Sequence, residues 1–304
     1  MQKVSIVILN FNGAEDTIAC LASLQNIKKS KTLKTEVIVV DNASSDGSLI
    51  KIKKKFPEVI LLENSQNLGF TGGCNEGARF ALKSGADYVT FLNNDTTVGP
   101  DFVEELVDGA KPLNVGGTLP KIYFYKGYEY HKDRYKKGDL GKVIWYAGGD
   151  MDWKNLIGKN RGVDEVDHGQ YDTKYETNLA TGCCFLIKAE VLNKIGLFDD
   201  RYFLYYEDAD LTERIKRAGY KIIYQPKAVI WHKNAASSGG SGSPLQDYYI
   251  SRNRLLFGMR YASVRTKVAL ARESLKNLGS GRLWQKKGIM DFYLRRFGRG
   301  SYPI

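Results

Sequence analysis

The feature that most constrains the fold is an alternation of short apolar runs with helical segments over the first 95 residues. The runs Lys3–Leu9 and Glu36–Val40 are rich in β-branched residues and end at polar turn formers, which is typical of buried parallel strands. Between them, Ala14–Asn26 carries apolar residues at helical spacing. Together the three segments predict a β-α-β unit.

The same alternation continues along the chain. Further predicted elements are a helix at Gly47–Lys55, a strand at Val59–Leu62, a helix at Gly73–Lys83 and a strand at Tyr88–Leu92. This pattern predicts an α/β fold with a doubly wound, mostly parallel sheet. In such sheets, ligands bind beyond the carboxyl ends of the strands.

Polar residues follow three of the predicted strands at the point where each strand ends. They are Asn10-Phe-Asn12 after the first strand, Asp41-Asn42 after the second, and Asn93-Asn94-Asp95 after the fourth. Because the carboxyl ends of parallel strands meet at one edge of a sheet, we expect all three groups to face one crevice.

The second half of the chain is less regular. Periodicity weakens between Lys111 and Asn178, where a hairpin or an irregular stretch is expected at Val143–Ala147. Apolar patterning then returns. It predicts strands at Leu179–Ala189, Tyr220–Tyr224 and Ala228–Trp231, and a helix at Asp208–Gly219.

Positive charge is concentrated near the C-terminus. Residues 240–304 contain 13 lysine and arginine residues against three acidic residues, which accounts for almost all of the formal net charge of +11. Ala235–Pro244 is rich in small residues and is expected to be a flexible loop. Asp247–Leu278 beyond it has mostly helical patterning. A basic tail of this kind can bind nucleic acid or anionic lipid headgroups, and composition leaves both open.

Two other properties bear on where the chain works. Val4–Leu9 is too short for the core of a signal peptide, and no apolar run approaches the roughly 18 residues of a membrane span. We therefore expect a cytoplasmic protein. The four cysteines show no paired CxxC spacing, which favours reduced, packed thiols over a zinc site.

Two aspartates at strand ends can carry chemistry. Asp95 can hold a hard divalent cation together with diphosphate oxygens and water, or it can cap the turn into a helix near Pro100–Gly109. Asp41 can accept a hydrogen bond from a nucleobase ring, or it can form an Asx turn while Asp46-Gly47 caps the next helix. Spacing leaves both interpretations of each aspartate open.

Three further segments have functional interpretations beside structural ones. The glycines of Asn67–Gly77 permit close backbone approach to a ligand, although glycine-rich strand-to-helix turns are common. Tyr205-Tyr-Glu-Asp-Ala-Asp210 places three carboxylates at a helix start. One of them can act as general base while the others cap the helix or hold basic neighbours. His232 follows an apolar strand and suits a metal ligand, a diphosphate contact or a structural role.

Taken together and in this order, the segments resemble the large family of inverting glycosyltransferases typified by bacterial rhamnosyl- and galactofuranosyltransferases with the GT-A fold. The matching stretches are Val4–Asn12, Val39–Ser48, Asn64–Gly77, Leu92–Thr96, Thr181–Leu186, Phe198–Gly219 and Trp231–His232. The resemblance implies a Rossmann-like sheet flanked by helices, here with a basic helical C-terminal extension. We divide the chain into a nucleotide-sugar-binding half (1–98), an acceptor-binding and catalytic half (99–234), and the loop with the extension (235–304).

The resemblance also implies roles for single residues. It has Asp41 contacting a pyrimidine base, Asp95 binding Mg²⁺ or Mn²⁺, Asp208 acting as catalytic base, and His232 completing the metal or diphosphate site. Further substrate contacts are expected at Asn10, Asn12, Asn67, Gly69, Gly72, Asn94, Thr181, Gly182 and Glu207. Many relatives carry two or three aspartates where this chain has Asn93-Asn94-Asp95. This departure predicts weak metal affinity and leaves metal dependence open.

The predicted reaction is an in-line displacement with inversion at the anomeric carbon, in which Asp208 removes the proton of an acceptor hydroxyl. We expect transfer of rhamnose from dTDP-rhamnose to a saccharide in cell-surface polysaccharide synthesis. A UDP-sugar-dependent galactofuranosyl- or other hexosyltransferase is the alternative.

Two other classes of protein are alternatives to a glycosyltransferase, and both fit the sequence less well. A nucleotidyltransferase would need a glycine-rich, lysine-containing triphosphate loop where the chain has Asn10-Phe-Asn-Gly13. A non-catalytic scaffold with a basic tail would leave the order of Asp41, Asp95 and Asp208 unexplained.

Two predictions concern the region after His232. Ser237–Ser243 is expected to close over the donor and exclude water. Because family acceptors are commonly lipid-linked saccharides, residues 247–299 are expected to bind an anionic membrane surface and no nucleic acid, which would make the protein peripheral on the cytoplasmic face of the inner membrane. A solvated basic face is the alternative. The residues expected at this surface are Arg252, Arg254, Arg260, Arg265 and Lys267 among Leu255, Leu256, Phe257 and Val264.

Overall fold

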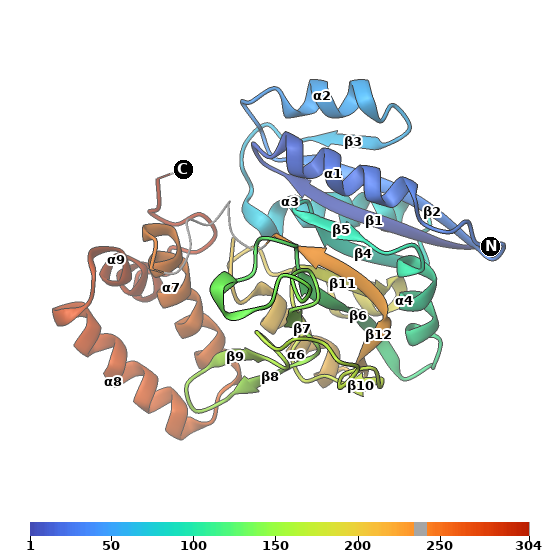
Figure 1. Cartoon of the computed structure of the whole chain (residues 1–304). Coiled ribbons are helices and arrows are strands. Elements are labelled where there is room, and N and C mark those ends of the chain that lie inside the picture. Colours follow the sequence, from blue (N-terminus) through green and yellow to red (C-terminus); the bar gives the residue numbers. More distant parts are fainter. Residues whose placement is uncertain (234–241, 304) are drawn as a thin grey trace.

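The apolar runs at the start of the chain form the parallel half of a mixed sheet. The structure, a computed structural model, describes residues 1–233 and 242–303. Within them a ten-stranded sheet runs through the centre of the molecule (Figure 1). Its strands are β1 (Gln2–Asn10), β2 (Leu33–Asp41), β3 (Ile60–Glu63), β4 (Tyr88–Asn93), β5 (Thr96–Val98), β6 (Val115–Phe124), β7 (Ile144–Tyr146), β10 (Tyr175–Glu176), β11 (Cys184–Lys188) and β12 (Lys221–His232).

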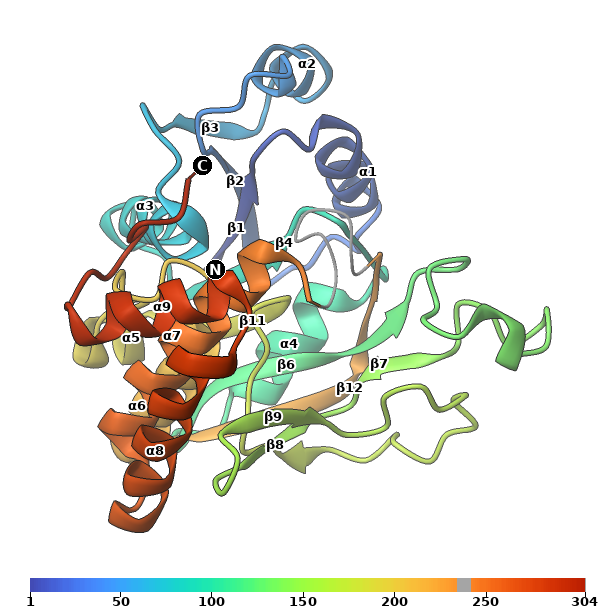
Figure 2. The ribbon, with the colours of Figure 1, turned by 90° about the vertical axis from the view of Figure 1, so that its left-hand side faces the viewer.

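Helices cover both faces of this sheet. Figure 2 shows β1 and β2 with one helix on either side, and a group of C-terminal helices packed beside the body. The strands β8 (Gly149–Asp152) and β9 (Ile157–Asn160) form a separate hairpin. The helices are α1 (Ala14–Gln25), α2 (Ser48–Lys55), α3 (Gly69–Lys83), α4 (Phe102–Ala110), α5 (Ala189–Ile195), α6 (Glu207–Arg217), α7 (Pro244–Tyr261), α8 (Val264–Ser280) and α9 (Leu283–Tyr293), with a 3₁₀ turn at Lys132–Arg134.

The register of the parallel strands aligns their carboxyl ends. β1 pairs in parallel with both β2 and β4, so that Asn10 lies opposite Asp41 and Leu9 lies opposite Asn93. The interior of these strands is fully buried, as at Ile6 and Val39, which explains why they are apolar on both faces. The predicted meeting of polar strand ends at one edge is therefore confirmed.

The strand β6 lies in the middle of the sheet but was not predicted. Its sequence contains Gly116, Gly117 and Pro120, which are residues that weaken a strand pattern. A Cβ atom at Gly117 would lie 2.6 Å from the ring of Phe185, so the glycine permits close approach of β11. Pro120 lies opposite Gln225, where the pairing with β12 is irregular, and its missing N–H is tolerated there.

The two strands predicted at Tyr220–Tyr224 and Ala228–Trp231 are one strand, β12. The register of β12 against β6 shifts between Gln225 and Val229. A bulge of this kind interrupts the apolar pattern without ending the strand.

The predicted basic helical extension consists of α7, α8 and α9. However, the membrane-facing set expected on α7 is wrong, because Arg252 and Phe257 are fully buried and Leu255 is 2% exposed. Arg254 pairs with Glu273 instead of facing a membrane. The apolar residues of α7 form a core with the rest of the molecule, which includes Leu156, Leu179, Tyr202 and Ala209.

Other expectations have mixed outcomes. All four cysteines are free and buried, as predicted. Across residues 1–233 and 242–303, no helix combines the length and the apolar character needed to cross a membrane. Most of the loop predicted at Ala235–Pro244, including Ser237–Ser241, lies outside the described residues, and Pro244 is the first residue of α7. The division of the chain after residues 98 and 234 stays a prediction.

Candidate active site

A chain of hydrogen bonds joins the polar residues at the ends of β1, β2 and β4. The amide of Asn10 donates to Asp41 Oδ1 at 2.7 Å, and Asn10 Oδ1 accepts from the hydroxyl of Thr17 at 2.7 Å. The Asn94 amide donates to the same hydroxyl at 3.0 Å. Thr17, which the sequence did not single out, is buried on α1 and links β1 to β4. The three predicted strand-end groups therefore form one network.

Asp41 is 2% exposed, and both of its carboxylate oxygens are engaged. Oδ2 accepts from the backbone N–H of Ser44, three residues on, at 2.9 Å, which is a local turn contact. Asp46 Oδ1 accepts from the N–H of Ser48, two residues on, which is an Asx turn, and Gly47 between them is the N-cap residue of α2, so the structural interpretation of Asp46-Gly47 holds. Each carboxylate oxygen has two lone pairs, so each oxygen of Asp41 can accept one further donor.

Several residues predicted to bind substrate have structural partners. Asn12 Oδ1 accepts from the N–H of Ser45 at 2.8 Å, and Asn67 Oδ1 accepts from the N–H of Gly69 at 2.8 Å. Gly69 has a φ of +73°, and a Cβ atom there would lie 2.5 Å from the ring of Phe203. At Gly72 a Cβ atom would lie 2.7 Å from Leu68. These glycines are therefore explained by packing alone, and their contact with substrate stays a prediction.

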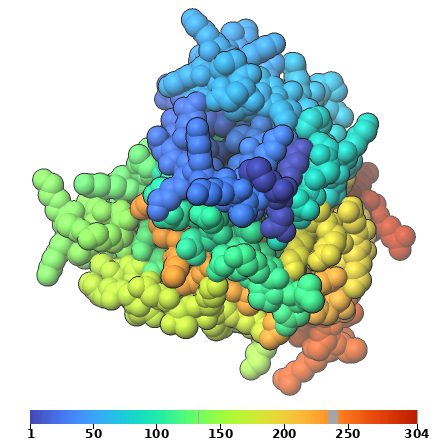
Figure 3. All heavy atoms as spheres, turned by 90° about the vertical axis from the view of Figure 1, so that its right-hand side faces the viewer, coloured from blue at the N-terminus to red at the C-terminus, as the bar shows by residue number. Residues whose placement is uncertain are grey.

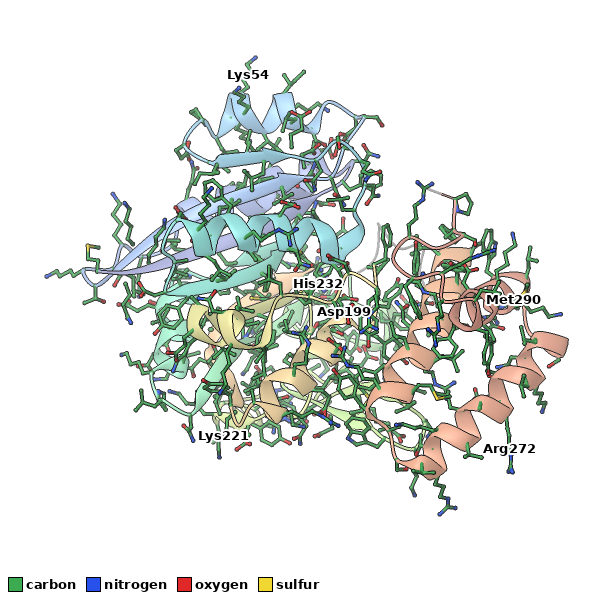
Figure 4. All side chains as sticks on the ribbon, turned by 180° about the vertical axis from the view of Figure 1, so that it is seen from behind. Lys54, Asp199, Lys221, His232, Arg272 and Met290 are labelled. Atoms are coloured by element: carbon green, nitrogen blue, oxygen red, sulfur yellow. The ribbon has the colours of Figure 1, made fainter. Side chains whose placement is uncertain are left out.

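The strand pairing brings Asp95 and His232 together. Antiparallel pairing of β5 with the end of β12 places His232 opposite Thr96, next to Asp95. His232 Nε2 lies 3.2 Å from Asp95 Oδ1. Figure 4 shows His232 well inside the outline of the molecule, whereas Arg272 and Met290 lie out on the C-terminal helices.

Asp95 Oδ1 and His232 Nε2 face each other and are the atoms that could bind one cation, whereas His232 Nδ1 lies on the other edge of the ring. Within the described part of the chain, Asp95 Oδ1 and His232 Nδ1 are buried without a hydrogen-bond partner. Buried polar atoms are rarely left unsatisfied unless a ligand, ion or water completes them. A carboxylate oxygen with an imidazole nitrogen is a donor set that suits Mn²⁺, and its oxygen alone suits Mg²⁺. The residues present therefore fit a divalent cation.

Two neighbours of this pair were missed in the sequence. The ring of Trp145 on β7 meets the ring of His232 edge to face, with centroids 4.8 Å apart. Lys233 Nζ lies 2.5 Å from Asp16 Oδ1, at the start of α1. The sequence offered two signals for these neighbours. One was the tryptophan in the stretch Val143–Ala147, and the other was the lysine directly after His232.

Asp208 and Glu207 begin α6 beside the start of β11. Asp208 Oδ2 accepts from the backbone N–H of Gly182 at 3.0 Å, and Oδ1 accepts from the N–H of Ala209 at 2.7 Å. Thr181, just before Gly182, accepts from the N–H of Cys183 at 3.2 Å. In the described residues Glu207 Oε2 is buried with no hydrogen-bond partner.

These environments separate the two carboxylates electrostatically. Burial raises the pKa of Glu207 well above its ordinary value, and the charge of Asp208 raises it further. Burial also raises the pKa of Asp208, but the N–H groups of Gly182 and Ala209 oppose that shift by stabilising the anion. Asp208 is therefore the member of the pair that holds a negative charge, which is the condition for a general base.

The third carboxylate of the segment has a structural role. Asp210 is fully buried and accepts from Arg214 at 2.7 Å, from Arg260 at 2.9 Å and from the hydroxyl of Tyr261 at 2.7 Å. The part of the sequence interpretation in which a carboxylate of this segment holds basic neighbours is therefore confirmed, whereas the role of general base stays a prediction.

Glu207 and Asp208 lie at the same edge of the sheet as Asp95 and His232. The N–H of Asn93 donates to the carbonyl of Cys183 at 2.8 Å, so the residue after Gly182 is joined to the strand that leads into Asp95. Figure 3 shows the N-terminal residues in blue lying against the green middle of the chain, with β12 in orange visible between green segments. The geometry can hold a diphosphate near Asp95 and His232 and accept a proton at Asp208.

Comparison with protein families agrees with this geometry. A family model described as Glycosyl transferase family 2 matches residues 5–196, and a model described as Glycosyltransferase like family 2 matches residues 161–255. The first match covers more than half of the chain.

Two similar proteins span most of this chain. The N-acetylglucosaminyl-diphospho-decaprenol L-rhamnosyltransferase of Mycobacterium tuberculosis is 28% identical over 233 residues, which cover 71% of this chain and 73% of that protein. The low-salt glycan biosynthesis hexosyltransferase Agl10 of Haloferax volcanii is 25% identical over 257 residues, which cover 84% of this chain and 75% of that protein.

Solved structures share the fold at low sequence identity. GalNAc-T7 with UDP, GalNAc and Mn²⁺ superimposes with a TM-score of 0.68 at 18% identity, over 96% of this chain and 54% of that one. This chain thus spans about half the length of that structure. The mannosyltransferase of Pyrobaculum calidifontis with GDP-Man and Mn²⁺ gives a TM-score of 0.54 at 14% identity, over 96% of this chain and 79% of that one.

Proposed function

The chain belongs to glycosyl transferase family 2 and is a glycosyltransferase with the GT-A fold, and from this premise we propose that it transfers a sugar to a saccharide hydroxyl with inversion. The observation that carries the proposal is the pair Glu207 and Asp208, in which the protein stabilises one carboxylate as an anion next to a cation-competent pair, Asp95 and His232. A general base opposite a leaving diphosphate is what a single displacement requires.

Asp208 removes the proton from the acceptor hydroxyl as that oxygen attacks the anomeric carbon of the donor. The bond from this carbon to the diphosphate oxygen breaks, and the nucleoside diphosphate leaves with the bonding electrons. The N–H groups of Gly182 and Ala209 hold the Asp208 carboxylate in place before the proton moves. Asp41, at the far end of the hydrogen-bonded network, accepts from the nucleobase of the donor.

Asp95 and His232 hold a divalent cation, Mn²⁺ or Mg²⁺. When bound, the ion offsets negative charge that develops on the leaving diphosphate. Within residues 1–233 and 242–303, no three histidine, cysteine, aspartate or glutamate side chains gather into a metal site. The remaining ligands would therefore be diphosphate oxygens and water, so ion and donor bind together. The Mn²⁺ in the two solved structures of the same fold supports this assignment.

The donor and acceptor are proposed from the relatives. The mycobacterial relative is a rhamnosyltransferase whose name gives a decaprenyl-diphosphate-linked N-acetylglucosamine acceptor. This supports dTDP-rhamnose as the donor and a lipid-linked saccharide as the acceptor. The hexosyltransferase relative and the UDP in GalNAc-T7 support a UDP-sugar as the alternative.

A lipid-linked acceptor would require the enzyme to reach a membrane surface. The exposed stripe of α8 suits this contact: Val264 is 77% exposed, Val268 46% and Leu275 61%. These residues recur at spacings of four and seven along the helix, so they share one face, and exposed Arg272 and Lys276 lie beside it. Apolar residues flanked by basic ones bind anionic lipid headgroups.

The proposed function is tested by thermal shift with uridine, deoxythymidine and guanosine diphosphates and their sugars, each with Mn²⁺, Mg²⁺ or chelator. We expect one pyrimidine nucleotide to raise Tm, more with Mn²⁺ than with Mg²⁺ because of the His232 nitrogen. The variant Asp95→Asn should lose the metal-dependent part of the shift. Asp101→Asn, which removes an exposed acid that pairs with Lys28, is the matched control. The absence of any nucleotide effect would contradict the proposal.

A further inference from the structure

The backbone that leads into Glu207 and Asp208 is strained. Phe203 has a φ of +65°, Tyr205 of +69° and Tyr206 of +70°. Bulky aromatic residues rarely adopt this left-handed region, because the Cβ atom crowds the neighbouring carbonyl. Three such residues within four positions persist only where surrounding contacts hold them.

Asn253 on α7 provides one set of these contacts. It is fully buried, and its side-chain nitrogen donates to three carbonyls of the strained segment, at 2.8 Å to Tyr202, 2.8 Å to Leu204 and 2.9 Å to Tyr205. An amide nitrogen carries two hydrogens, so three carbonyls share them. A single side chain thus holds three backbone carbonyls within Tyr202–Tyr205 pointing towards α7.

Arg252 fixes the orientation of that amide. Its Nε–H donates to Asn253 Oδ1 at 3.0 Å. An arginine can only donate, so the atom it faces must be the amide oxygen, and the amide nitrogen must point to the carbonyls. Arg252 also donates to the carbonyls of Tyr202 at 2.9 Å and Arg201 at 3.2 Å. It is fully buried, and these carbonyls replace the water that its charge would otherwise require.

The opposite side of the segment is held by α3. The N–H groups of Phe70 and Thr71, in the first turn of α3, donate to the carbonyl of Phe203 at 2.8 and 3.2 Å. The ring of Phe203 stacks on Tyr249 of α7, with centroids 5.1 Å apart. The strained segment is therefore clamped between the start of α3 and the middle of α7.

We infer that Arg252 and Asn253 are positioning residues for the reaction, because they set where α6 begins and so where Asp208 meets the acceptor hydroxyl. This inference rests on the proposed role of Asp208 as base. Neither residue needs to touch substrate, since each acts through the carbonyls of Arg201–Tyr205. The C-terminal helices then belong to the catalytic apparatus, and the buried charge of Arg252 has a reason to be retained.

The inference predicts a loss of rate without a loss of donor binding. In Asn253→Ala the three carbonyls lose their donor and the strained residues can relax, which moves Asp208. A displacement of about 1 Å costs on the order of a hundredfold in rate, so kcat should fall by about that factor while the donor KM stays within about threefold. Arg252→Lys keeps the charge but loses the donor that orients Asn253, and should give an intermediate loss.

Arg254→Ala is the matched control, because Arg254 lies on the same helix but its guanidinium donates to Glu273 and to the carbonyl of Asn155, not to the carbonyls of Arg201–Tyr205. It should keep the wild-type kcat even if it lowers Tm. Hydrogen exchange by mass spectrometry gives a readout that needs no substrate. In Asn253→Ala, amides from Arg201 to Asp208 should exchange faster than in the wild type, whereas those of β4 should not.

The outcomes separate this inference from the proposed function. If amide hydrogen exchange at Arg201–Asp208 is unchanged in both Asn253→Ala and Arg252→Lys, these two side chains do not hold the strained segment in place, and the inference is overturned. Faster exchange with a kcat equal to that of Arg254→Ala would overturn the positioning role. If Asn253→Ala does not fold, Arg252→Lys carries the same test. A wild-type protein that transfers no sugar from any nucleotide donor would refute the proposed function, while the exchange data would still decide whether the clamp exists.

Discussion

At the scale of single residues, the site depends on how the protein treats two neighbouring carboxylates differently. The sequence showed Glu207 and Asp208 at a helix start, but not that Gly182, in the turn before β11, would donate to only one of them. It also predicted that Asp95 and His232 act together, and the β5–β12 pairing brings them to 3.2 Å. Asn253 carried no signal, because its partners lie about 50 residues away in the chain.

The raised pKa of Glu207 predicts a pH dependence of stability. Between the ordinary glutamate pKa of 4.5 and the raised value in the folded protein, the unfolded chain releases a proton that the folded protein retains. Fewer protons are then bound in the unfolded state, so the free energy of unfolding falls as pH rises through this window. Glu207→Gln, which is always neutral, should remove this part of the fall.

Urea unfolding of the wild type and Glu207→Gln from pH 5 to pH 8 measures the effect. The stability of Glu207→Gln relative to the wild type should increase with pH. A difference that stays constant or decreases with pH would show that Glu207 is not a buried, protonated acid.

At the scale of elements, the sequence predicted those whose pattern is local. The parallel strands β1 to β4 and the helices α1 to α4 have clear local patterns, and each was expected near its observed place. The strand β6 was missed because Gly116, Gly117 and Pro120 have low strand propensity. They are accommodated because neighbouring elements pack closely against this strand, which a local pattern does not show. The glycines of α3 suggested ligand approach, but Gly77 instead lets the helix pack closely on β1 and β2.

Gly77→Ala should therefore destabilise the fold. A Cβ atom there would lie 2.3 Å from Val7 and 3.0 Å from Val40, both buried and stiff at χ1. Overpacking of this kind costs about 1–3 kcal/mol, which thermal or urea unfolding can measure. Gly279→Ala in α8 has nothing within 4 Å of the added atom and should cause no loss. Equal unfolding midpoints for the two variants would contradict the packing argument.

At the scale of the whole molecule, the basic C-terminal helices differ from the body in net charge, and they differ from one another in how much apolar surface they expose. The basic excess beyond residue 240 was visible in the sequence, but which residues face outward was not, because α7 is buried by the body and α8 is not. Local periodicity cannot distinguish these helices, since both carry mixed apolar and basic residues. The membrane contact that we propose therefore lies on the exposed stripe of α8 and not at Arg252 and Phe257.

The double variant Val268→Glu with Leu275→Glu should abolish membrane binding. Flotation with vesicles of phosphatidylglycerol and phosphatidylcholine should carry the wild type upward, and less so at high salt because the lipid charge is screened. Leu113→Glu changes an apolar residue that is 89% exposed on the body, and it should float like the wild type. Equal flotation of all three proteins would remove α8 from the membrane contact.

The central claim is that Asp208 is the base of an inverting sugar transfer. Its most direct test is the turnover of Asp208→Asn with the donor selected by thermal shift and a polyprenyl-diphosphate-linked N-acetylglucosamine acceptor, alongside Glu213→Gln on the same helix. The account predicts a loss of kcat of at least about a hundredfold for Asp208→Asn, with nucleotide stabilisation intact and Glu213→Gln fully active. Wild-type turnover by Asp208→Asn would contradict it.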